Sequence, residues 1–313
     1  MKSFVIGKND AGQRLDKFLR KAVPGLPVSL LYKAIRQKDI KINKGRCHPG
    51  DQLSEGDTLT VYLPDDLFTA KPYPFLNAGA ELAVVYEDAH ILICNKPQGL
   101  LVHQGDGHSP DTLILRIQRY LYQKGEWDPA LEHSFSPALC HRIDRNTSGI
   151  VIAAKTFEAL KILTEKIRER QVTKLYLAIL HGIPQKKSGT LKGYLRKNEN
   201  AGKVEVSKNP FPGGKTALTK YRIIESREGK SLVEAELLTG RTHQIRAQFA
   251  AIGHPLWGDA KYGSSRENKQ LDNRQALCAY KVVFSFTGPA GPLDYLCGRS
   301  FEIPPPFGWQ QSD

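Results

Sequence analysis

The chain has 313 residues, 40% of them hydrophobic, and carries a formal net charge of +13. This length suggests about two domains, and no apolar run reaches the roughly 18 residues that a membrane-spanning helix needs. The lack of such a run excludes a membrane-spanning protein. The first ten residues contain no long apolar stretch, which argues against a secreted protein, and we therefore expect a protein of the cytoplasm.

The five cysteines argue against both a disulfide framework and a thiolate metal site, because their number is odd and no two form a CxxC pair. We therefore expect reduced, mostly buried thiols and no bound metal. The motifs GxGxxG, P-loop, HExxH and GxSxG are also absent, so we expect no nucleotide cofactor. The cysteines are Cys47, Cys94, Cys140, Cys278 and Cys297.

The positive charge is concentrated in two segments. Residues 1–63 hold 12 Lys and Arg against 6 Asp and Glu, and residues 186–230 hold 12 against 4. The rest of the chain holds 21 against 22. Such concentration indicates a polyanionic partner, with nucleic acid first and an anionic membrane surface second. Solvated faces without any partner would give the same pattern.

Residues 1–63 are predicted to form a small α/β domain. Apolar residues recur at helical spacing over residues 15–22 and again over residues 31–35. Short strands are expected at residues 40–42 and 58–63. The basic residues of the two helices fall outside the apolar stripes, which gives the domain two cationic helices.

This first domain resembles a small RNA-binding module shared with a ribosomal small-subunit protein, here called the S-four-type domain. The resemblance rests on GQRLDKFLRKAV, SLLYKAIRQKDIKIN and GDTLTVYL. It implies that helix cations approach RNA phosphates, although each of them could equally be a solvated helix charge. The cations concerned are Arg14, Lys17, Lys33 and Arg36.

Residues 64–80 are predicted to be a semi-stiff linker, because three prolines lie among few branched residues. A second domain then occupies residues 81–313. Strands outnumber helices in it and interleave with them unevenly, which favours an α+β fold with a mixed, mostly antiparallel sheet. Strands are expected at residues 91–94, 150–155, 174–180, 216–224, 231–238 and 282–286, and helices at residues 156–171 and 242–253.

The segment His141–Gly149, HRIDRNTSG, places the carboxylate of Asp144 between two arginines. Two guanidinium groups favour the ionised carboxylate, which could act as a nucleophile or a base. The turn-forming residues around it lead into a buried strand, a common location for catalytic groups. The alternative is a surface turn in which Asp144 pairs with Arg142 or Arg145 and does nothing else.

Arg241 and Tyr176 are two further candidates. Arg241 precedes a predicted helix N-terminus, where free N–H groups and the helix dipole attract anions. It would bind a phosphate or pair with an internal carboxylate such as Asp144, or form an ordinary ion pair. Tyr176 shares one face of its strand with the small Ala178, so a base could stack there; an ordinary core tyrosine is the alternative.

The motifs HRIDRNTSG, KLYLAILHG and LLTGRTHQIRAQFAAIGHPLWGDAKYG, in this order and after NKPQGLLVH, resemble those of RluA-type pseudouridine synthases. The resemblance covers most of residues 81–286. With the S-four-type domain in front, the chain is similar to the RluC and RluD branch, which acts on large-subunit (23S) ribosomal RNA. The resemblance therefore implies isomerisation of specific uridines to pseudouridine, with RNA as the partner and without a cofactor.

The resemblance also assigns site residues. It implies that Asp144 is the catalytic aspartate, that Tyr176 stacks on the target base and that Arg241 is the partner of the aspartate. Arg142 would help to hold the base out of its stack, and Leu277 would be an apolar residue of the pocket. Whether the aspartate attacks the substrate or removes a ribose proton stays open.

Two other classes of protein remain as alternatives. A noncatalytic ribosome-binding or RNA-binding protein would explain the charge but leave the acid, the tyrosine and the arginine without a joint purpose. A glycoside hydrolase usually needs a second carboxylate that flanks the same bond, and none is evident in the sequence. The oligomeric state is not indicated.

Overall fold

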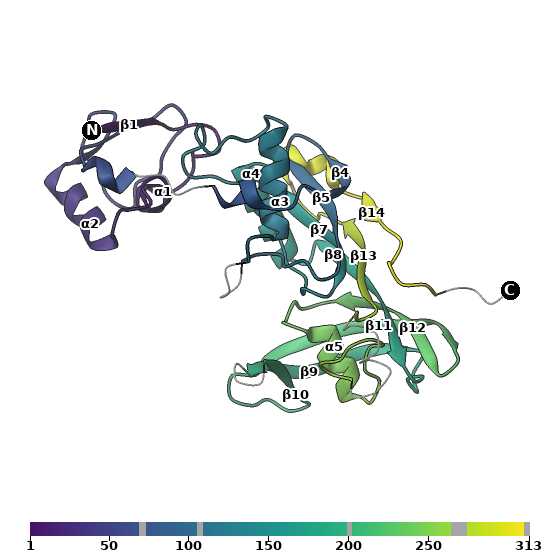
Figure 1. The fold of residues 1–313 in the computed structure, drawn as a ribbon. Coiled ribbons are helices and arrows are strands. Elements are labelled where there is room, and N and C mark those ends of the chain that lie inside the picture. The colour runs from purple at the N-terminus through teal and green to yellow at the C-terminus, as the bar shows by residue number, and fades with distance from the viewer. Residues whose placement is uncertain (69–72, 105–108, 199–201, 264–273, 310–313) are drawn as a thin grey trace.

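The structure is a computed structural model that describes residues 1–68, 73–104, 109–198, 202–263 and 274–309. It shows a small N-terminal module beside a larger part that contains a long, strongly twisted sheet (Figure 1). Within the described ranges, no helix combines the length and the apolar character needed to cross a membrane.

The N-terminal module is a three-stranded antiparallel sheet, in the order β1-β3-β2, that shares a hydrophobic core with two helices. The predicted apolar stripes of both helices are buried, which leaves their cations on the outside. The elements are β1 (Lys2–Val5), α1 (Leu15–Ala22), α2 (Val28–Gln37), β2 (Ile40–Ile42) and β3 (Thr58–Val61).

Both ends of the predicted linker pack against the rest of the protein. Two short 3-10 helices lie there, η1 (Asp65–Phe68) and η2 (Pro74–Asn77). Phe68 belongs to the hydrophobic core of the N-terminal module, whereas Phe75 belongs to that of the larger part. The linker boundaries at residues 64 and 80 stay a prediction.

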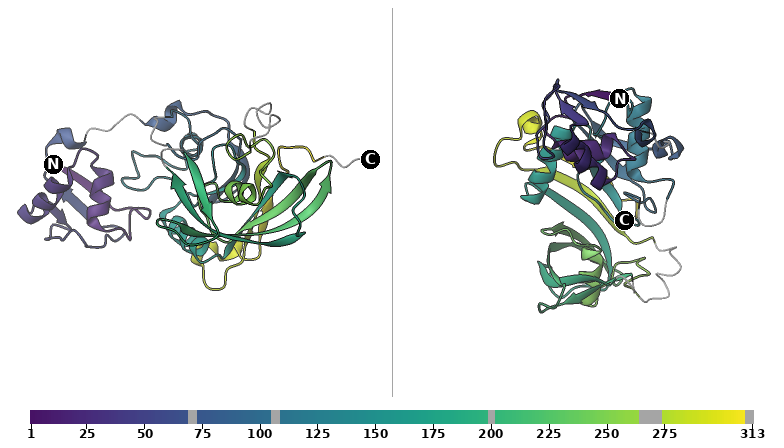
Figure 2. Two further views of the ribbon diagram at one scale, coloured as in Figure 1. Left: turned by 90° about the horizontal axis from the view of Figure 1, so that it is seen from below. Right: turned by 90° about the vertical axis from the view of Figure 1, so that its left-hand side faces the viewer.

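Buried hydrogen bonds join the N-terminal module to the larger part. The carboxylate of Asp10, 2% exposed, accepts hydrogen bonds from the backbone N–H and the hydroxyl of Ser134 at 2.9 and 2.5 Å. The side-chain amide of Gln13 donates to the same hydroxyl at 2.6 Å, and that of Asn9 donates to Glu132 at 2.8 Å. These contacts fix the module against one end of the larger part (Figure 2).

The larger part contains eleven strands and three α-helices in the described residues. The strands are β4 (Ala83–Glu87), β5 (Ile91–Lys96), β6 (Ala138–Leu139), β7 (Ser148–Ala154), β8 (Val172–His181), β9 (Ser188–Asn198), β10 (Lys203–Ser207), β11 (Lys215–Arg227), β12 (Lys230–Leu237), β13 (Leu277–Phe284) and β14 (Ser300–Glu302). The helices are α3 (Leu113–Gln123), α4 (Phe157–Arg168), α5 (Gln244–Ala251) and the 3-10 helix η3 (Gly291–Leu296).

These strands form one mixed sheet in the order β10-β9-β11-β12-β8-β13-β7-β5-β4, with β14 on β13 and β6 on β7. Its strand pairs are antiparallel except for β13 with β7, which is parallel. The α+β fold with a mixed, mostly antiparallel sheet is therefore confirmed. Helices α3 and α4 lie at one end of the sheet and α5 at the other, where it packs against β9, β10 and β11 (Figure 1).

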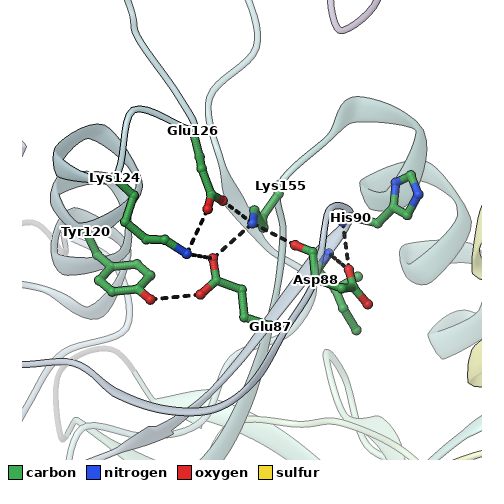
Figure 3. Close-up of polar contacts among 8 residues, drawn as sticks. Glu87, Asp88, His90, Tyr120, Lys124, Glu126 and Lys155 are labelled. Atoms are coloured by element: carbon green, nitrogen blue, oxygen red, sulfur yellow. Dashed lines mark hydrogen bonds and ion pairs between the residues drawn. The ribbon is translucent and has the colours of Figure 1, made fainter.

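A network of charged side chains connects β4, α3 and the end of β7 (Figure 3). The ammonium group of Lys155, whose side chain is 8% exposed, lies 2.9 Å from the carboxylate of Glu87 and also pairs with Glu126. Lys124 reaches the same two carboxylates at 3.0 and 2.7 Å, and the hydroxyl of Tyr120 donates to Glu87 at 2.8 Å. The network ties the first turn of the sheet to the helix that covers it.

This network predicts a loss of stability in acid. Burial opposes the charged form of Glu87, but hydrogen bonds from Lys155, Lys124 and Tyr120 outweigh it and lower its pKa from 4.5 to about 2. A carboxyl group whose pKa is lower in the folded state stabilises the fold above its unfolded pKa and loses that effect as the pH falls. Between about pH 4.5 and about pH 2, the difference in free energy of unfolding between the wild type and Glu87→Gln should therefore shrink. Urea unfolding of both proteins across this range measures it, and a constant difference would contradict the prediction.

Candidate active site

A cavity of about 310 Å³ lies between the loop that precedes β7, strand β8, the start of β13 and the segment that leads into α5. Every residue that the sequence analysis proposed for catalysis or for binding of the target base lines this cavity. These residues are Asp144, Tyr176, Arg241, Arg142 and Leu277. The fold therefore brings together side chains from four separate segments of the chain.

Asp144 occupies a tight turn just before the buried strand β7. Its carbonyl accepts a hydrogen bond from the N–H of Thr147 at 3.1 Å, and its side chain is 26% exposed. The side-chain amide of Gln275 holds the hydroxyl of Thr147 at 3.0 Å. Gly149 then adopts a φ of 119°, and a Cβ there would lie 2.3 Å from the carbonyl oxygen of Ala279. The turn requires glycine because β7 and β13 approach each other so closely.

The NKPQG motif supports the turn from behind. The ammonium group of Lys96 is fully buried and donates to the carbonyls of Pro97, Leu100 and Arg145 at 2.8, 2.8 and 2.9 Å. Burial lowers the pKa of Lys96 to about 7, while the negative charge of Asp144 acts in the opposite direction. Because Arg145 is the next residue after Asp144, Lys96 fixes the backbone that carries the carboxylate.

The charge partner of Asp144 is Arg246. The guanidinium of Arg246 lies 3.7 Å from the carboxylate of Asp144 and makes two shorter contacts, 2.7 and 2.9 Å, with Asp259. Arg241 is exposed, and its Nε donates to the carbonyl of Thr216 at 3.0 Å. The predicted ion pair between Asp144 and Arg241 is therefore wrong in this structure.

The position at which α5 begins explains why Arg246, and not Arg241, pairs with Asp144. Helix α5 begins at Gln244, so Arg246 lies in its first turn and is buried, whereas Arg241 precedes the helix on the surface. Burial opposes the charge of Arg246, but Asp259 and Asp144 outweigh it and raise its pKa. The other neighbour, Arg145, donates instead to the carbonyl of Gly99 at 2.9 Å.

Tyr176 and Leu277 form the apolar wall of the cavity. They are 4% and 3% exposed, and both belong to the main hydrophobic core. Tyr176 lies on the same face of β8 as Ala178, as predicted. Burial and the nearby charge of Asp144 raise the pKa of Tyr176, so it remains a neutral phenol. A flat base could lie against this wall.

The structure also shows supporting residues that the sequence analysis did not single out. Arg246 follows the buried Ile245 in α5, and its partner Asp259 is almost fully buried at 1% exposure. Two signals for this pair were present in the sequence. Arg246 is a charged residue next to an apolar one in a predicted helix, and Asp259 is an acid within the segment HPLWGDAKYG. Gln98, whose side-chain amide donates to the carbonyls of Asn146 and Gln275 at 3.2 and 2.7 Å, and Lys96 were visible only as part of the NKPQG motif.

The four predicted RNA-binding cations lie on the surface of the N-terminal module. Lys17, Lys33 and Arg36 are exposed. Arg14 is exposed too, but it contacts the carboxylate of Asp16 at 2.8 Å. Their role in RNA binding stays a prediction.

No group of three or more metal-ligating side chains comes together among the residues that the structure describes. All five cysteines are free thiols, of which only Cys297 is exposed. Burial raises the pKa of Cys94 and Cys140 to about 12, which keeps both as inert thiols.

The chain belongs to the RNA pseudouridylate synthase family, whose model matches residues 90–251. The match covers the NKPQG motif, the loop of Asp144 and α5 up to its last residue. The S4 domain model matches residues 13–59, within the N-terminal module. The protein is therefore a pseudouridine synthase, an isomerase, preceded by an RNA-binding S4 domain.

Curated relatives resemble the chain along almost its whole length. It is 36% identical over 311 residues to a protein of Haemophilus ducreyi named "Ribosomal large subunit pseudouridine synthase C", covering 93% of this chain and 92% of that protein. A protein of Salmonella typhi with the same name is 33% identical over 324 residues, covering 97% of this chain and 96% of that one. Among solved structures, "Human RNA Pseudouridylate Synthase Domain Containing 1" matches with a TM-score of 0.56 and 25% identity, covering 73% of this chain and 85% of that one.

Proposed function

We propose that this protein converts specific uridines of large-subunit (23S) ribosomal RNA to pseudouridine, with Asp144 as the reactive group. The observation that carries the proposal is the carboxylate of Asp144 at 3.7 Å from the buried guanidinium of Arg246, in a cavity walled by Tyr176 and Leu277. The names of the curated relatives supply the class of RNA. A noncatalytic RNA-binding role gives this pairing of Asp144 with a buried arginine no purpose.

The reaction requires a group that is ionised and correctly oriented. The bond between N1 of uracil and C1′ of ribose must break, uracil must turn, and C5 must bond to the same C1′ and then lose its hydrogen. Asp144 would either attack the substrate or remove the ribose proton that begins a glycal route. Arg246 would hold the carboxylate in its charged form and in place, and Lys96 would fix its backbone.

The uracil must also leave its stack and remain bound while it turns. Flipping a base costs a few kcal/mol, and stacking against an aromatic ring restores part of that without fixing one orientation. Tyr176 and Leu277 provide such a surface. Arg142, an exposed residue that lines the cavity, would take the space that the target base leaves. Arg241, exposed beside the same cavity, would contact an RNA phosphate rather than Asp144.

Release of tritium from RNA tests the proposal. Only a pseudouridine synthase must replace the hydrogen on C5, so large-subunit ribosomal RNA with C5-tritiated uridine, taken from cells that lack this protein, should release tritium when the protein is added. Release at the rate of a no-enzyme control would refute the function. Small-subunit ribosomal RNA from the same cells, labelled in the same way, is the control substrate and should release no tritium.

We also propose that the S4 domain holds the ribosomal RNA through its exposed cations, and that the protein works in the cytoplasm where this RNA is found. The double variant Lys33→Gln and Arg36→Gln should bind large-subunit RNA more weakly than the wild type does. It should lower the slope of log affinity against log salt by roughly 1 for each RNA phosphate that the two side chains no longer neutralise. Turnover at saturating RNA should stay unchanged, because both residues lie far from the cavity along the chain and in the other module (Figure 1).

Filter binding at several salt concentrations measures this effect. Lys161→Gln is the matched control, since Lys161 is an exposed helix cation outside both basic segments. Equal affinities and equal salt slopes for the double variant and the wild type would remove the S4 helices from the RNA interface.

A further inference from the structure

His243 lines the same cavity as Asp144, and the proposed chemistry of Asp144, Arg246 and Tyr176 does not require it. It is the residue just before α5 and adopts a left-handed backbone conformation with a φ of 51°. This conformation is uncommon for a residue other than glycine. It turns the chain between the exposed Arg241 and the buried Arg246 and leaves the imidazole half-buried at the cavity.

The hydroxyl of Tyr262 links the backbone of β10 to the imidazole of His243. The backbone N–H of Val204, in β10, donates to the hydroxyl oxygen of Tyr262 at 2.8 Å. A peptide N–H can only donate, so the one hydrogen of that hydroxyl is left for another acceptor. The Nδ1 atom of His243 lies 2.9 Å from the same oxygen, and the two rings meet edge to face. With the hydroxyl donating to Nδ1, the neutral ring carries its proton on Nε2. The same oxygen could also accept from an Nδ1–H, so this tautomer is part of the inference.

The surroundings keep the imidazole neutral. Burial lowers the pKa of His243 to about 4. The carboxylates of Asp144 and Asp259 act in the opposite direction, and the cations Arg246 and Lys261 add to the lowering. At neutral pH the ring is thus a single N–H donor. Among the described residues, the hydrogen bond of this ring is the one between Nδ1 and Tyr262.

We propose that the Nε2–H of His243 donates a hydrogen bond to a carbonyl oxygen of the flipped uracil, and that Tyr262 is the positioning residue that aims this donor. The inference rests on the proposed function, because it takes the cavity to be the uridine site. Uracil offers two carbonyl acceptors, O2 and O4, and one N3–H donor. A neutral donor suits a carbonyl oxygen, whereas the exposed cation Arg241 beside it suits a phosphate.

This contact would also strengthen during the reaction. When the bond between N1 and C1′ breaks, the electron pair stays on uracil and its charge spreads onto the carbonyl oxygens. A preformed N–H donor stabilises charge that develops in this way. The same contact would give a reason for the left-handed turn at His243, which a simple helix start does not require.

Two substitutions of His243 separate the donor from the fold. His243→Asn should lower kcat/KM by about tenfold or more, because it removes the donor at the Nε2 position. Asparagine tolerates a left-handed backbone better than most residues, so strain does not explain the loss. His243→Gln places an amide N–H near the position of Nε2 and should recover part of the activity. Equal kcat/KM for the wild type and His243→Asn, or no recovery by His243→Gln, would overturn the proposal.

The carbonyl is identified with transcripts in which the target uridine is replaced by 2-thiouridine or 4-thiouridine. Sulfur accepts hydrogen bonds more weakly than oxygen. With one of the two thio substrates, kcat/KM of the wild type should fall by about the same factor as His243→Asn lowers it on the normal substrate. For His243→Asn itself, that thio substrate and the normal substrate should give the same kcat/KM. If both thio substrates slow the wild type and His243→Asn by the same factor, His243 contacts neither carbonyl.

The tautomer is measured without RNA, which keeps this test independent of the proposed function. In ¹⁵N-histidine spectra of the full-length protein at pH 7, the signal that His243→Asn removes should show Nε2 protonated and Nδ1 unprotonated. Tyr262→Phe should mix the two tautomers, a change that loss of packing alone would not cause. A protonated Nδ1 in the wild type would overturn the proposal. If neither the wild type nor any variant releases tritium from RNA, the proposed function fails instead.

Discussion

Replacing Asp144 with asparagine is expected to abolish pseudouridine formation while RNA binding survives. Asparagine has nearly the same shape, but it has neither the charge that a nucleophile or base needs nor an ionised partner for Arg246. The loss should be on the order of 10⁵-fold or more, as for removal of other catalytic nucleophiles. Single-turnover tritium release measures the chemical step, and filter binding measures the affinity for RNA.

The fold should tolerate this change. The side chain of Asp144 is partly exposed, and Arg246 keeps its two hydrogen bonds to Asp259. Asp65→Asn, at an exposed carboxylate of η1, is the matched control and should retain full activity. Product formation by Asp144→Asn within tenfold of the wild type would remove Asp144 from the chemistry.

Replacing Arg246 with methionine is expected to harm both stability and activity. Its side chain is buried and pairs with two carboxylates, one of which, Asp259, is 1% exposed. Removing one partner of a buried ion pair leaves an uncompensated charge and costs about 3–5 kcal/mol. Catalysis should also fail, because Asp144 loses the group that orients it. Urea unfolding and tritium release measure the two effects.

Two further variants separate these effects and compare the two arginines. Adding Asp259→Asn to Arg246→Met removes the unpaired charge but keeps an oxygen for the N–H groups of Lys261 and Tyr262. This pair of changes should recover stability without activity. Arg241→Gln should change the free energy of unfolding by less than about 0.5 kcal/mol, because Arg241 is exposed. A larger loss of stability in Arg241→Gln than in Arg246→Met would reverse the assignment of the charge partner.

The elements that the sequence predicted correctly are those with local signals, whereas α3, β9 and β10 were not predicted. The stripe of Leu31, Ala34 and Ile35 lies in α2 and is buried as its spacing predicts. The alternation around Tyr176 and Ala178 gave both the strand and the face that lines the cavity. In each case a single period determines which side chains are buried.

The pairing of charges was not predictable from the motifs alone. Arg241 and Arg246 stand five positions apart in the same segment, and either could have faced Asp144. The choice depends on the left-handed turn at His243, after which α5 begins and turns Arg246 inward. That turn is supported by Tyr262, a contact between segments that no period in the sequence reveals.

The most direct test of the central claim is carbodiimide mapping of ribosomal RNA, which marks pseudouridines at single-nucleotide resolution. RNA from cells that lack the protein is compared with RNA from cells that carry the wild type or Asp144→Asn. We expect one or more pseudouridines of large-subunit RNA to be absent without the protein, restored by the wild type and not restored by Asp144→Asn. An identical set of pseudouridines in all three would contradict the assignment of this protein as a ribosomal RNA pseudouridine synthase that acts through Asp144.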